Sequence, residues 1–477
     1  MKQQNKNFIL NVTYQLLTYV FPLLTVPYTS RVLGVDNIGV YSYTYSIVYM
    51  FMLAAMLGIG NYGNREIARV RDNPDELSQV FTSIYALQVM MGTAATLIYA
   101  VYGLRFCKLY PGITQLQSIF LLSACIDVNW FYFGLEKFKM TITRNLIIKI
   151  SSLLLIFLIV KNENDLWKYT LIMAGATFIS QLYLFVNLPH YVKIVKVSLK
   201  EIFSHFHSVL ILFIPILAFG IYRVMDKTML GSLSSVTELG YYENAERLIN
   251  IPISVINALG TVMLPYMAYM AKNGKGKLNS IISESMNTAL VLATMMAGGL
   301  ILIANDAAIV IFGREFEKSS GIIIVLSITI IASAWANVIR TQYLIPNRQD
   351  GIYIRSTIWG AVANFICNVI FIKQYGAYGA CIGTILAEYF IMLYQSFAIG
   401  NKLPQREFVK QLIQAGIKTA IIVVLGYLFT FSIANQSVRL VAKIVIAMAL
   451  FVLINHTFIR SFLGAREGNK KNADNTI

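Results

Sequence analysis

The sequence predicts an all-α polytopic membrane protein with about 14 transmembrane helices. Hydrophobic residues make up 57% of its 477 residues and charged residues only 13%, about half the share that soluble domains carry. The mean hydropathy is +0.63. Apolar runs of about 20 residues recur along the whole chain, and each is long enough to cross the hydrocarbon core of a bilayer. These observations exclude a water-soluble globular protein and a disordered chain.

Each apolar run is predicted to be a helix, because backbone groups in lipid must form their hydrogen bonds within their own segment. A β-barrel is excluded, since it would show alternating segments of about 10 residues. The predicted spans are residues 8–29, 38–61, 80–104, 115–135, 145–161, 168–188, 207–230, 238–265, 280–304, 319–343, 352–373, 378–398, 409–432 and 438–459.

The first span is predicted to be retained. Lys2 and Lys6 precede it, and the run contains Pro22 and Pro27 before it ends at Arg31. No small-residue cleavage site follows the run, so the pattern favours a membrane helix over a signal peptide.

The positive charges predict the orientation of the chain. If both termini are cytoplasmic and residues at span ends are counted with the adjoining loops, 22 of the 39 Lys and Arg residues fall in inner segments and 9 in outer loops. This excess follows the rule that cytoplasmic loops carry more Lys and Arg, and it accounts for most of the net charge of +16 without a nucleic-acid partner. The outer loops are short, the longest being about 305–318, so no extracellular domain is expected. The inner stretches 62–79 and 189–206 are amphipathic and are predicted to lie along the cytoplasmic surface.

Two short segments repeat the same pattern. Leu33-Gly34 is followed by Ile38-Gly39-Val40-Tyr41, and Leu230-Gly231 is followed by Leu239-Gly240-Tyr241-Tyr242. Each lies where an odd-numbered span ends outside and the next one begins. A duplicated six-helix half would give this pattern, and parallel repeats are common in transporters. The predicted organisation is an N-terminal lobe (1–205, spans 1–6), a C-terminal lobe (206–400, spans 7–12), and two additional spans with a polar cytoplasmic tail (401–477).

Ionisable side chains within spans are costly and usually face a bundle interior or a cavity. The densest group lies on spans 7 and 8 and contains Arg223, Asp226, Lys227, Glu243, Glu246 and Arg247. Arg223 and Lys227 share one helix face, and Asp226 can pair with Arg223. One interpretation is local pairing that anchors the outer ends of the helices. The other is a partly cationic cavity wall, which the depth of Arg223 within its span favours.

Two carboxylates lie apart from this group. Asp127 in span 4 is interpreted either as the partner of Arg144 or Lys149 or as a functional group. Glu388 in span 12 is deep and isolated. It is interpreted either as a protonated or hydrogen-bonded carboxyl or as a proton or Na⁺ site.

No cofactor or metal site is predicted. The four cysteines are scattered and lack the spacing of a disulfide scaffold or a zinc ribbon. The four histidines fall near the inner surface and show no metal-binding pattern. No glycine-rich phosphate loop is present, so the chain is not expected to hydrolyse ATP.

Several stretches together resemble the bacterial polysaccharide-unit flippases, which export O-antigen or capsule oligosaccharides and belong to the MATE-like exporter superfamily. The matching stretches are Phe21–Gly34 with Gly39-Val-Tyr-Ser, Tyr62–Arg69, Asp127–Lys139 with Thr143-Arg-Asn, and Arg223–Gly231 with Gly240-Tyr-Tyr and Asn244–Arg247. Phe133 departs from the family pattern, which often has Gln there, so a polar contact is expected to be absent at this position.

The resemblance implies two six-helix lobes around a central cavity, two extra helices, and no enzymatic activity. It implies transport of undecaprenyl-pyrophosphate-linked oligosaccharide from the inner to the outer leaflet of the bacterial plasma membrane. Membrane lipids and the glycan polymerase machinery are the other expected partners. The expected cationic cavity residues are Arg31, Arg223, Lys227 and Arg247, and the expected charge partners or ion-coupling residues, for H⁺ or Na⁺, are Asp127, Asp226, Glu243, Glu246 and Glu388.

Four alternatives stay open. A lipid II flippase would share the fold and the anionic carrier. A MATE-type drug or cation antiporter would require acidic cavity residues, and Asp127 and Glu388 keep it in consideration. A membrane glycan polymerase or glycosyltransferase would need a catalytic loop domain, for which the outer loops are too short. The fourth alternative is a purely structural membrane protein.

Overall fold

The computed structural model describes residues 2–105, 109–273 and 275–456, and within these ranges the regular structure is helical with no β-strand. The described residues group into two compact units. The first contains the chain up to Glu243 together with Phe365–Ala380, and the second contains Asn244–Asn364 and the chain from Cys381 onward. The predicted division into two six-span lobes and two added spans stays a prediction.

The first unit is built from α1 to α9 and the opening turns of α10. Their bounds are α1 (Lys2–Met56), α2 (Ile59–Val70), α3 (Pro74–Arg105), α4 (Pro111–Cys125), α5 (Asn129–Gly134), α6 (Phe138–Ile159), α7 (Leu166–Asn187), α8 (Leu199–Ser204), α9 (Phe206–Leu233) and α10 (Val236–Asn273). The end of α14 and the start of α15 also belong to this unit.

The second unit holds α10 from Asn244 onward and most of the remaining helices. They are α11 (Lys275–Ala307), α12 (Ser319–Ser327), α13 (Thr329–Val338), α14 (Asp350–Tyr375), α15 (Ala377–Ile399), α16 (Gln405–Thr430) and α17 (Gln436–Ile454). Two π-helical turns extend α11 and α13, at Ala308–Phe312 and Ile339–Leu344. The stretch 305–318 is therefore mostly helical, and it is interrupted at Gly313 and by a turn at 317–318.

The helices confirm a multi-pass all-α membrane protein. Twelve helical segments of the described chain are long and apolar enough to cross a membrane. They correspond to the predicted spans 2–6 and 8–14. Predicted span 1 lies in the first arm of α1, and predicted span 7 coincides with α9.

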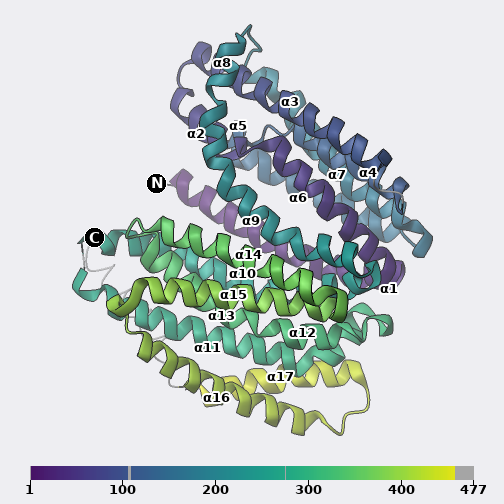
Figure 1. Ribbon diagram of the computed structural model, residues 1–477, viewed down its shortest axis with the longest axis vertical. Coiled ribbons are helices and arrows are strands. Elements are labelled where there is room, and N and C mark those ends of the chain that lie inside the picture. Colours follow the sequence, from purple (N-terminus) through teal and green to yellow (C-terminus); the bar gives the residue numbers. More distant parts are fainter. Residues whose placement is uncertain (1, 106–108, 274, 457–477) are drawn as a thin grey trace. The chain divides into compact units, whose positions relative to one another are not determined.

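The first two predicted spans form one bent helix, α1. Gly34 has φ 75° and ψ 172°, which interrupts the helical backbone between two arms. Glycine suits this position because it has no Cβ to clash at positive φ. Figure 1 shows α1 running from the N-terminus to a sharp bend and then reversing direction. A bend thus replaces the loop that the sequence suggested between the two spans.

Two short helices lie in the stretches predicted to be amphipathic. α2 buries Ile59, Tyr62 and Ile67 on one face. α8 begins with a capping box, in which Ser198 and Glu201 each bind the other's backbone N–H. Their position at the cytoplasmic surface stays a prediction.

The packed cores combine aliphatic side chains with pairs of aromatic rings. In the first unit, Phe81 stacks on Trp130 with ring centroids 5.5 Å apart. In the second, Trp335 packs edge-to-face on Phe408 at 5.7 Å. Other large apolar side chains point outward in rows along α6, α16 and α17; examples are Leu158, Phe429 and Leu453, at 69%, 62% and 68% exposure. Apolar surface on this scale suits contact with lipid tails.

Candidate functional site

The first candidate site is a polar cluster between α1, α9 and α10 in the first unit. Lys227 Nζ on α9 lies 2.8 Å from Glu243 Oε2 on α10, and these side chains are only 19% and 9% exposed. The Ser42 hydroxyl on α1 donates to the same carboxylate oxygen at 2.6 Å. Glu243 of α10 therefore contacts both the preceding helix, α9, and α1, which is about 200 residues away in the sequence.

Asp226 forms the second half of this cluster. Its carboxylate is buried and accepts hydrogen bonds from the Tyr242 hydroxyl at 3.0 Å and from Asn368 Nδ2 at 2.6 Å. Asn368 comes from the part of α14 that belongs to the first unit. Neighbouring residues of α9, Asp226 and Lys227, thus contact neighbouring residues of α10, Tyr242 and Glu243.

These contacts change the charge balance expected for span 7. Along α9 alone, Asp226 is the carboxylate within helical reach of both Arg223 and Lys227, and one carboxylate would leave about one positive charge uncompensated. In the structure, Glu243 compensates Lys227 from a different helix. Arg223 lies on α9, but its side chain is outside the described residues. Spacing along one helix does not reveal partners on another.

A glycine crossing brings α1 and α10 together beside this cluster; it comprises Val35–Ser42 of α1 and Val236–Glu243 of α10. A Cβ atom on Gly39 would overlap the carbonyl oxygen of Val236, and one on Gly240 would overlap that of Val35. The two backbones can approach this closely only because both positions are glycine. Small residues serve the same purpose in other membrane helix pairs.

The crossing has approximate two-fold symmetry. Thr237 donates to the Asp36 carboxylate at 2.5 Å, and Ser42 donates to Glu243; in both pairs the residues are 201 positions apart. Gly39 and Gly240 lie midway and are separated by the same number. Residues three apart on one helix thus meet their equivalents on the other, so the two segments run parallel. The repeated sequence patterns therefore pack against each other.

The second candidate site surrounds Asp127 in the first unit. Asn129 Nδ2 donates to Asp127 Oδ1 at 2.7 Å, and Asn129 Oδ1 accepts from Arg144 Nη2 at 3.0 Å. Arg144 is buried and also donates to the Ser180 carbonyl oxygen at 2.8 Å. Asp127 is therefore linked to Arg144, as one interpretation expected, but through Asn129.

Two glycines position this second site. A Cβ on Gly63 of α2 would overlap the Trp130 ring, and one on Gly134 of α5 would overlap Ile67 of α2. The Tyr62–Arg69 stretch therefore packs directly against the Asp127–Lys139 stretch. Phe133, where a polar residue was expected in relatives, stacks on Phe138 with centroids 5.8 Å apart.

The remaining predicted residues have separate surroundings. Arg31 is exposed on α1. In the second unit, Arg247 Nη1 lies 3.5 Å from Asn244 Oδ1, and Glu246 is half-buried. Glu388 Oε2 accepts a hydrogen bond from the Ser333 hydroxyl at 2.7 Å, which fits a hydrogen-bonded carboxyl.

Sequence reasoning left several cations within spans of the second unit unexamined, and Arg340 is one of them. Arg340 Nη2 lies 3.5 Å from Asn257 Oδ1, and its guanidinium stands 5.3 Å from the centre of the Tyr353 ring. Asn337 Nδ2 donates to the same Asn257 oxygen at 2.8 Å. The signal was available, since Arg340 falls inside predicted span 319–343.

Within the described residues, no group of three or more His, Cys, Asp and Glu side chains is placed to hold a metal ion. The chemistry of the two candidate sites is therefore that of ion pairs and hydrogen bonds between helices. Such contacts can be exchanged when helices move, and cationic members can receive an anionic ligand.

Comparison with known proteins identifies the family to which these motifs belong. The family model described as "Polysaccharide biosynthesis protein" matches residues 5–271. The protein named "Putative O-antigen transporter" from Shigella dysenteriae is 22% identical over 407 residues, covering 83% of this chain and 99% of that protein. "Lipid II flippase MurJ" of Bacillus subtilis is 24% identical over 218 residues, covering 43% of this chain and 40% of that protein.

Solved structures show the same fold. A structure titled "Lipid II flippase MurJ, inward closed conformation" aligns with a TM-score of 0.73 at 17% identity, covering 96% of this chain and 99% of that one. An inward-facing multidrug resistance MATE family transporter of the MOP superfamily aligns with a TM-score of 0.61 at 14% identity, covering 87% and 98%.

Proposed function

Since the chain belongs to the family of polysaccharide biosynthesis proteins, we propose that it is a flippase for a lipid-linked oligosaccharide. The family match over residues 5–271 carries this proposal, because it takes in both polar clusters of the first unit. The cargo is an oligosaccharide repeat unit on undecaprenyl pyrophosphate, moved from the inner to the outer leaflet of the bacterial plasma membrane. Both termini are cytoplasmic, and a glycan polymerase receives the product.

The pyrophosphate is the part of the cargo that a cationic cavity recognises. Arg31, Arg223, Lys227 and Arg247 are the proposed cavity cations, since Arg and Lys in a dry site attract phosphate oxygens. The Lys227–Glu243 ion pair supports a role for Lys227 that changes with the conformation of the protein. While the pair is intact, its charge is held by Glu243; when α9 and α10 separate, the ammonium group becomes available to the anion.

The glycine crossing is the proposed outer gate. Segments 35–42 and 236–243 lie where the predicted spans 1, 2, 7 and 8 meet the outer surface. Close backbone contact there blocks the outer end, and separation of α1 from α10 opens it, as alternating access requires. If transport is coupled to H⁺ or Na⁺, Asp127 and Glu388 are the carboxylates proposed to bind the ion.

A lipid II flippase is the second candidate. The relative from Bacillus subtilis carries that name and shares 24% identity over part of the chain. Both cargoes carry a pyrophosphate on a polyprenyl chain, so the cationic residues would serve either. The glycan attached to the carrier distinguishes the two functions.

The test is deletion of the gene in its native host. Loss of the flippase should leave undecaprenyl-pyrophosphate-linked repeat units in the inner leaflet and remove the polysaccharide from the surface, and a plasmid copy should restore it. Arg223→Ala should fail to restore it at equal protein level, whereas Arg223→Lys should restore part. If deletion leaves surface polysaccharide intact and lipid II accumulates instead, the second candidate replaces the first.

A further inference from the structure

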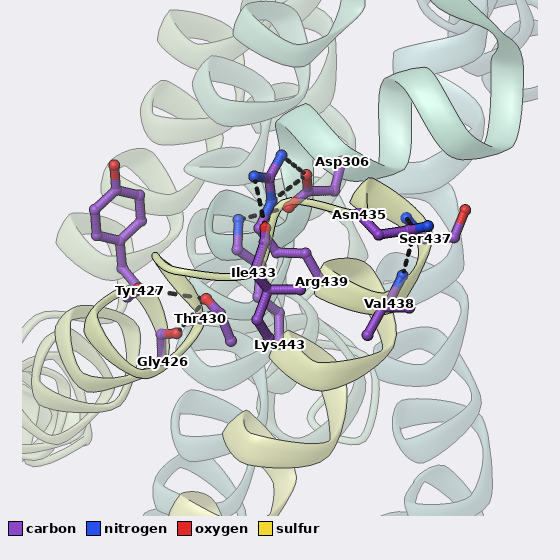
Figure 2. A network of polar contacts seen from close by, with 10 residues as sticks. All are labelled: Asp306, Gly426, Tyr427, Thr430, Ile433, Asn435, Ser437, Val438, Arg439 and Lys443. Carbon is purple, nitrogen blue, oxygen red and sulfur yellow. Dashed lines mark hydrogen bonds and ion pairs between the residues drawn. The ribbon is translucent and has the colours of Figure 1, made fainter.

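A second charge cluster lies in the second unit, between α11 and α17, and no role has been assigned to it. Asp306 lies at the end of α11. Its Oδ1 atom accepts a hydrogen bond from Arg439 Nε at 2.8 Å and lies 2.6 Å from Arg439 Nη2. Lys443 Nζ lies 2.7 Å from the Oδ2 atom. Figure 2 shows both cationic side chains of α17 converging on this one carboxylate.

The cluster has two cations for one anion. Among the described residues, the ion pairs of Arg439 and Lys443 both go to Asp306. Asp306 is fully buried, and the Lys443 side chain is only 7% exposed. The cluster therefore keeps a formal charge of about +1 where little water can solvate it. An uncompensated charge in such surroundings is unfavourable unless an anion approaches.

The surroundings indicate what kind of anion can approach. The Arg439 side chain is 22% exposed, so its guanidinium is reached from the surface. The neighbouring Val438, Val441 and Tyr427 side chains are 56%, 60% and 54% exposed, which forms an apolar surface around it. An anion attached to an apolar chain fits both features.

The helix end adds to the positive potential. Arg439 lies in the first turn of α17, whose N-terminus is capped by Asn435 through the backbone N–H groups of Ser437 and Val438. The N-terminus of a helix carries a partial positive charge. On the predicted topology this end of α17 lies at the outer membrane surface, at the depth of lipid phosphates.

We propose that Asp306, Arg439 and Lys443 form a binding site for the phosphate of a membrane lipid, separate from the transport cavity. The phosphate contacts Arg439 and the exposed side of the cluster, and its acyl or prenyl chain lies along the apolar surface of α17. The proposal concerns lipid-borne phosphate as a class, and it does not depend on which cargo the protein transports. An anionic phospholipid and undecaprenyl phosphate are the two sources to distinguish.

The test counts lipids bound to the purified full-length protein. The protein is released from nanodiscs of phosphatidylcholine and phosphatidylglycerol, and retained lipids are measured by native mass spectrometry. Wild type should retain one more phosphatidylglycerol than Arg439→Gln or Lys443→Met, whose affinity should fall about tenfold or more. Undecaprenyl phosphate is then added to the wild-type protein. If it displaces the phosphatidylglycerol, undecaprenyl phosphate is the preferred ligand; if the phosphatidylglycerol stays bound, the phospholipid is preferred.

Asp306→Asn separates this proposal from a purely structural ion-pair cluster. It removes the internal anion and keeps both cations, so it should retain the extra lipid as wild type does. Lys418→Met on α16 is the control, because it removes a cation outside this cluster. This variant should retain the extra lipid as wild type does. Equal lipid counts in wild type and Arg439→Gln would overturn the proposal, as would loss of the lipid in Asp306→Asn with unchanged thermal stability. The Arg439 side chain is partly exposed, so Arg439→Gln should fold even if Lys443→Met does not, and the comparison with wild type can still be made.

Discussion

Replacement of Gly39 by alanine tests whether the glycine crossing closes the outer end. A Cβ at this position would overlap the carbonyl oxygen of Val236 on α10, so the two helices could not keep their present separation. Overpacking of a close contact costs about 1–3 kcal/mol. Alanine also improves helix propensity by about 1 kcal/mol, but this gain applies to α1 in both the closed and the open state and cancels between them.

The expected shift is therefore about 5- to 150-fold toward the open state. It can be measured by labelling Leu239→Cys with an impermeant thiol reagent from outside, in a chain whose natural cysteines are replaced by serine. Leu239 is fully buried next to the crossing, so the cysteine should react only when the crossing opens. Gly39→Ala should raise the labelling rate by at least about fivefold.

The matched control is Gly175→Ala on α7, where a Cβ would meet no atom within 4 Å. This variant should label at the wild-type rate. If Gly39→Ala also labels at the wild-type rate while the protein keeps its thermal stability, the crossing does not exclude the reagent, and the gate must lie elsewhere.

Three further predictions concern topology, the Asp127 site and pH. A cysteine at Ser234 should react with an impermeant reagent from outside and one at Lys200 should not; the reverse pattern would contradict cytoplasmic termini. Arg144→Gln should destabilise the protein by about 3 kcal/mol in thermal unfolding, because a charged donor with several buried acceptors is lost, and an unchanged melting temperature would contradict that role. Burial lowers the pKa of His205 below its ordinary 6.5, against an opposing effect of Glu66. The neutral ring, which contacts hydroxyls on α2 and α3, therefore contributes stability above about pH 6.5 that is lost as pH falls through the lowered pKa. His205→Asn should melt below wild type at about pH 7.5, and the difference in melting temperature should shrink as the pH is lowered.

The membrane spans could be predicted because lipid imposes one rule on every segment. Backbone groups that cannot reach water must bond within their helix, so an apolar run of about 20 residues has one available structure. The bend at Gly34 was less predictable. A Leu-Gly step at a span boundary suggests a turn, but the backbone angles that merge two spans into α1 depend on how both arms pack.

Side-chain partners were the least predictable part. Spacing rules apply within one helix, whereas Glu243 meets Lys227 and Ser42 from two other helices. Asp306 was assigned to the outer loop 305–318 and therefore to solvent, although it is fully buried. In contrast, the repeated glycine pattern did carry three-dimensional information, because the two glycines that it aligned, Gly39 and Gly240, lie at one helix crossing.

The Lys227–Glu243 pair allows a final prediction that separates two roles for Lys227. If the pair chiefly holds α9 to α10, Lys227→Met and Glu243→Gln should each destabilise the protein by about 3–5 kcal/mol, because each leaves a buried charge without its partner. The double variant removes both charges and should recover most of that loss. Thermal unfolding of the four proteins measures this coupling directly.

Transport measured on the same four proteins gives the second half of the argument. If Lys227 also binds the pyrophosphate, the double variant should be stable yet inactive. It leaves no buried charge without a partner, but it lacks the cation that the pyrophosphate requires. Glu243→Gln alone should keep part of its activity, because the cation survives. A double variant that is both stable and fully active would show that Lys227 serves only the ion pair, and the cavity charge would then have to come from residues such as Arg223 and Arg247.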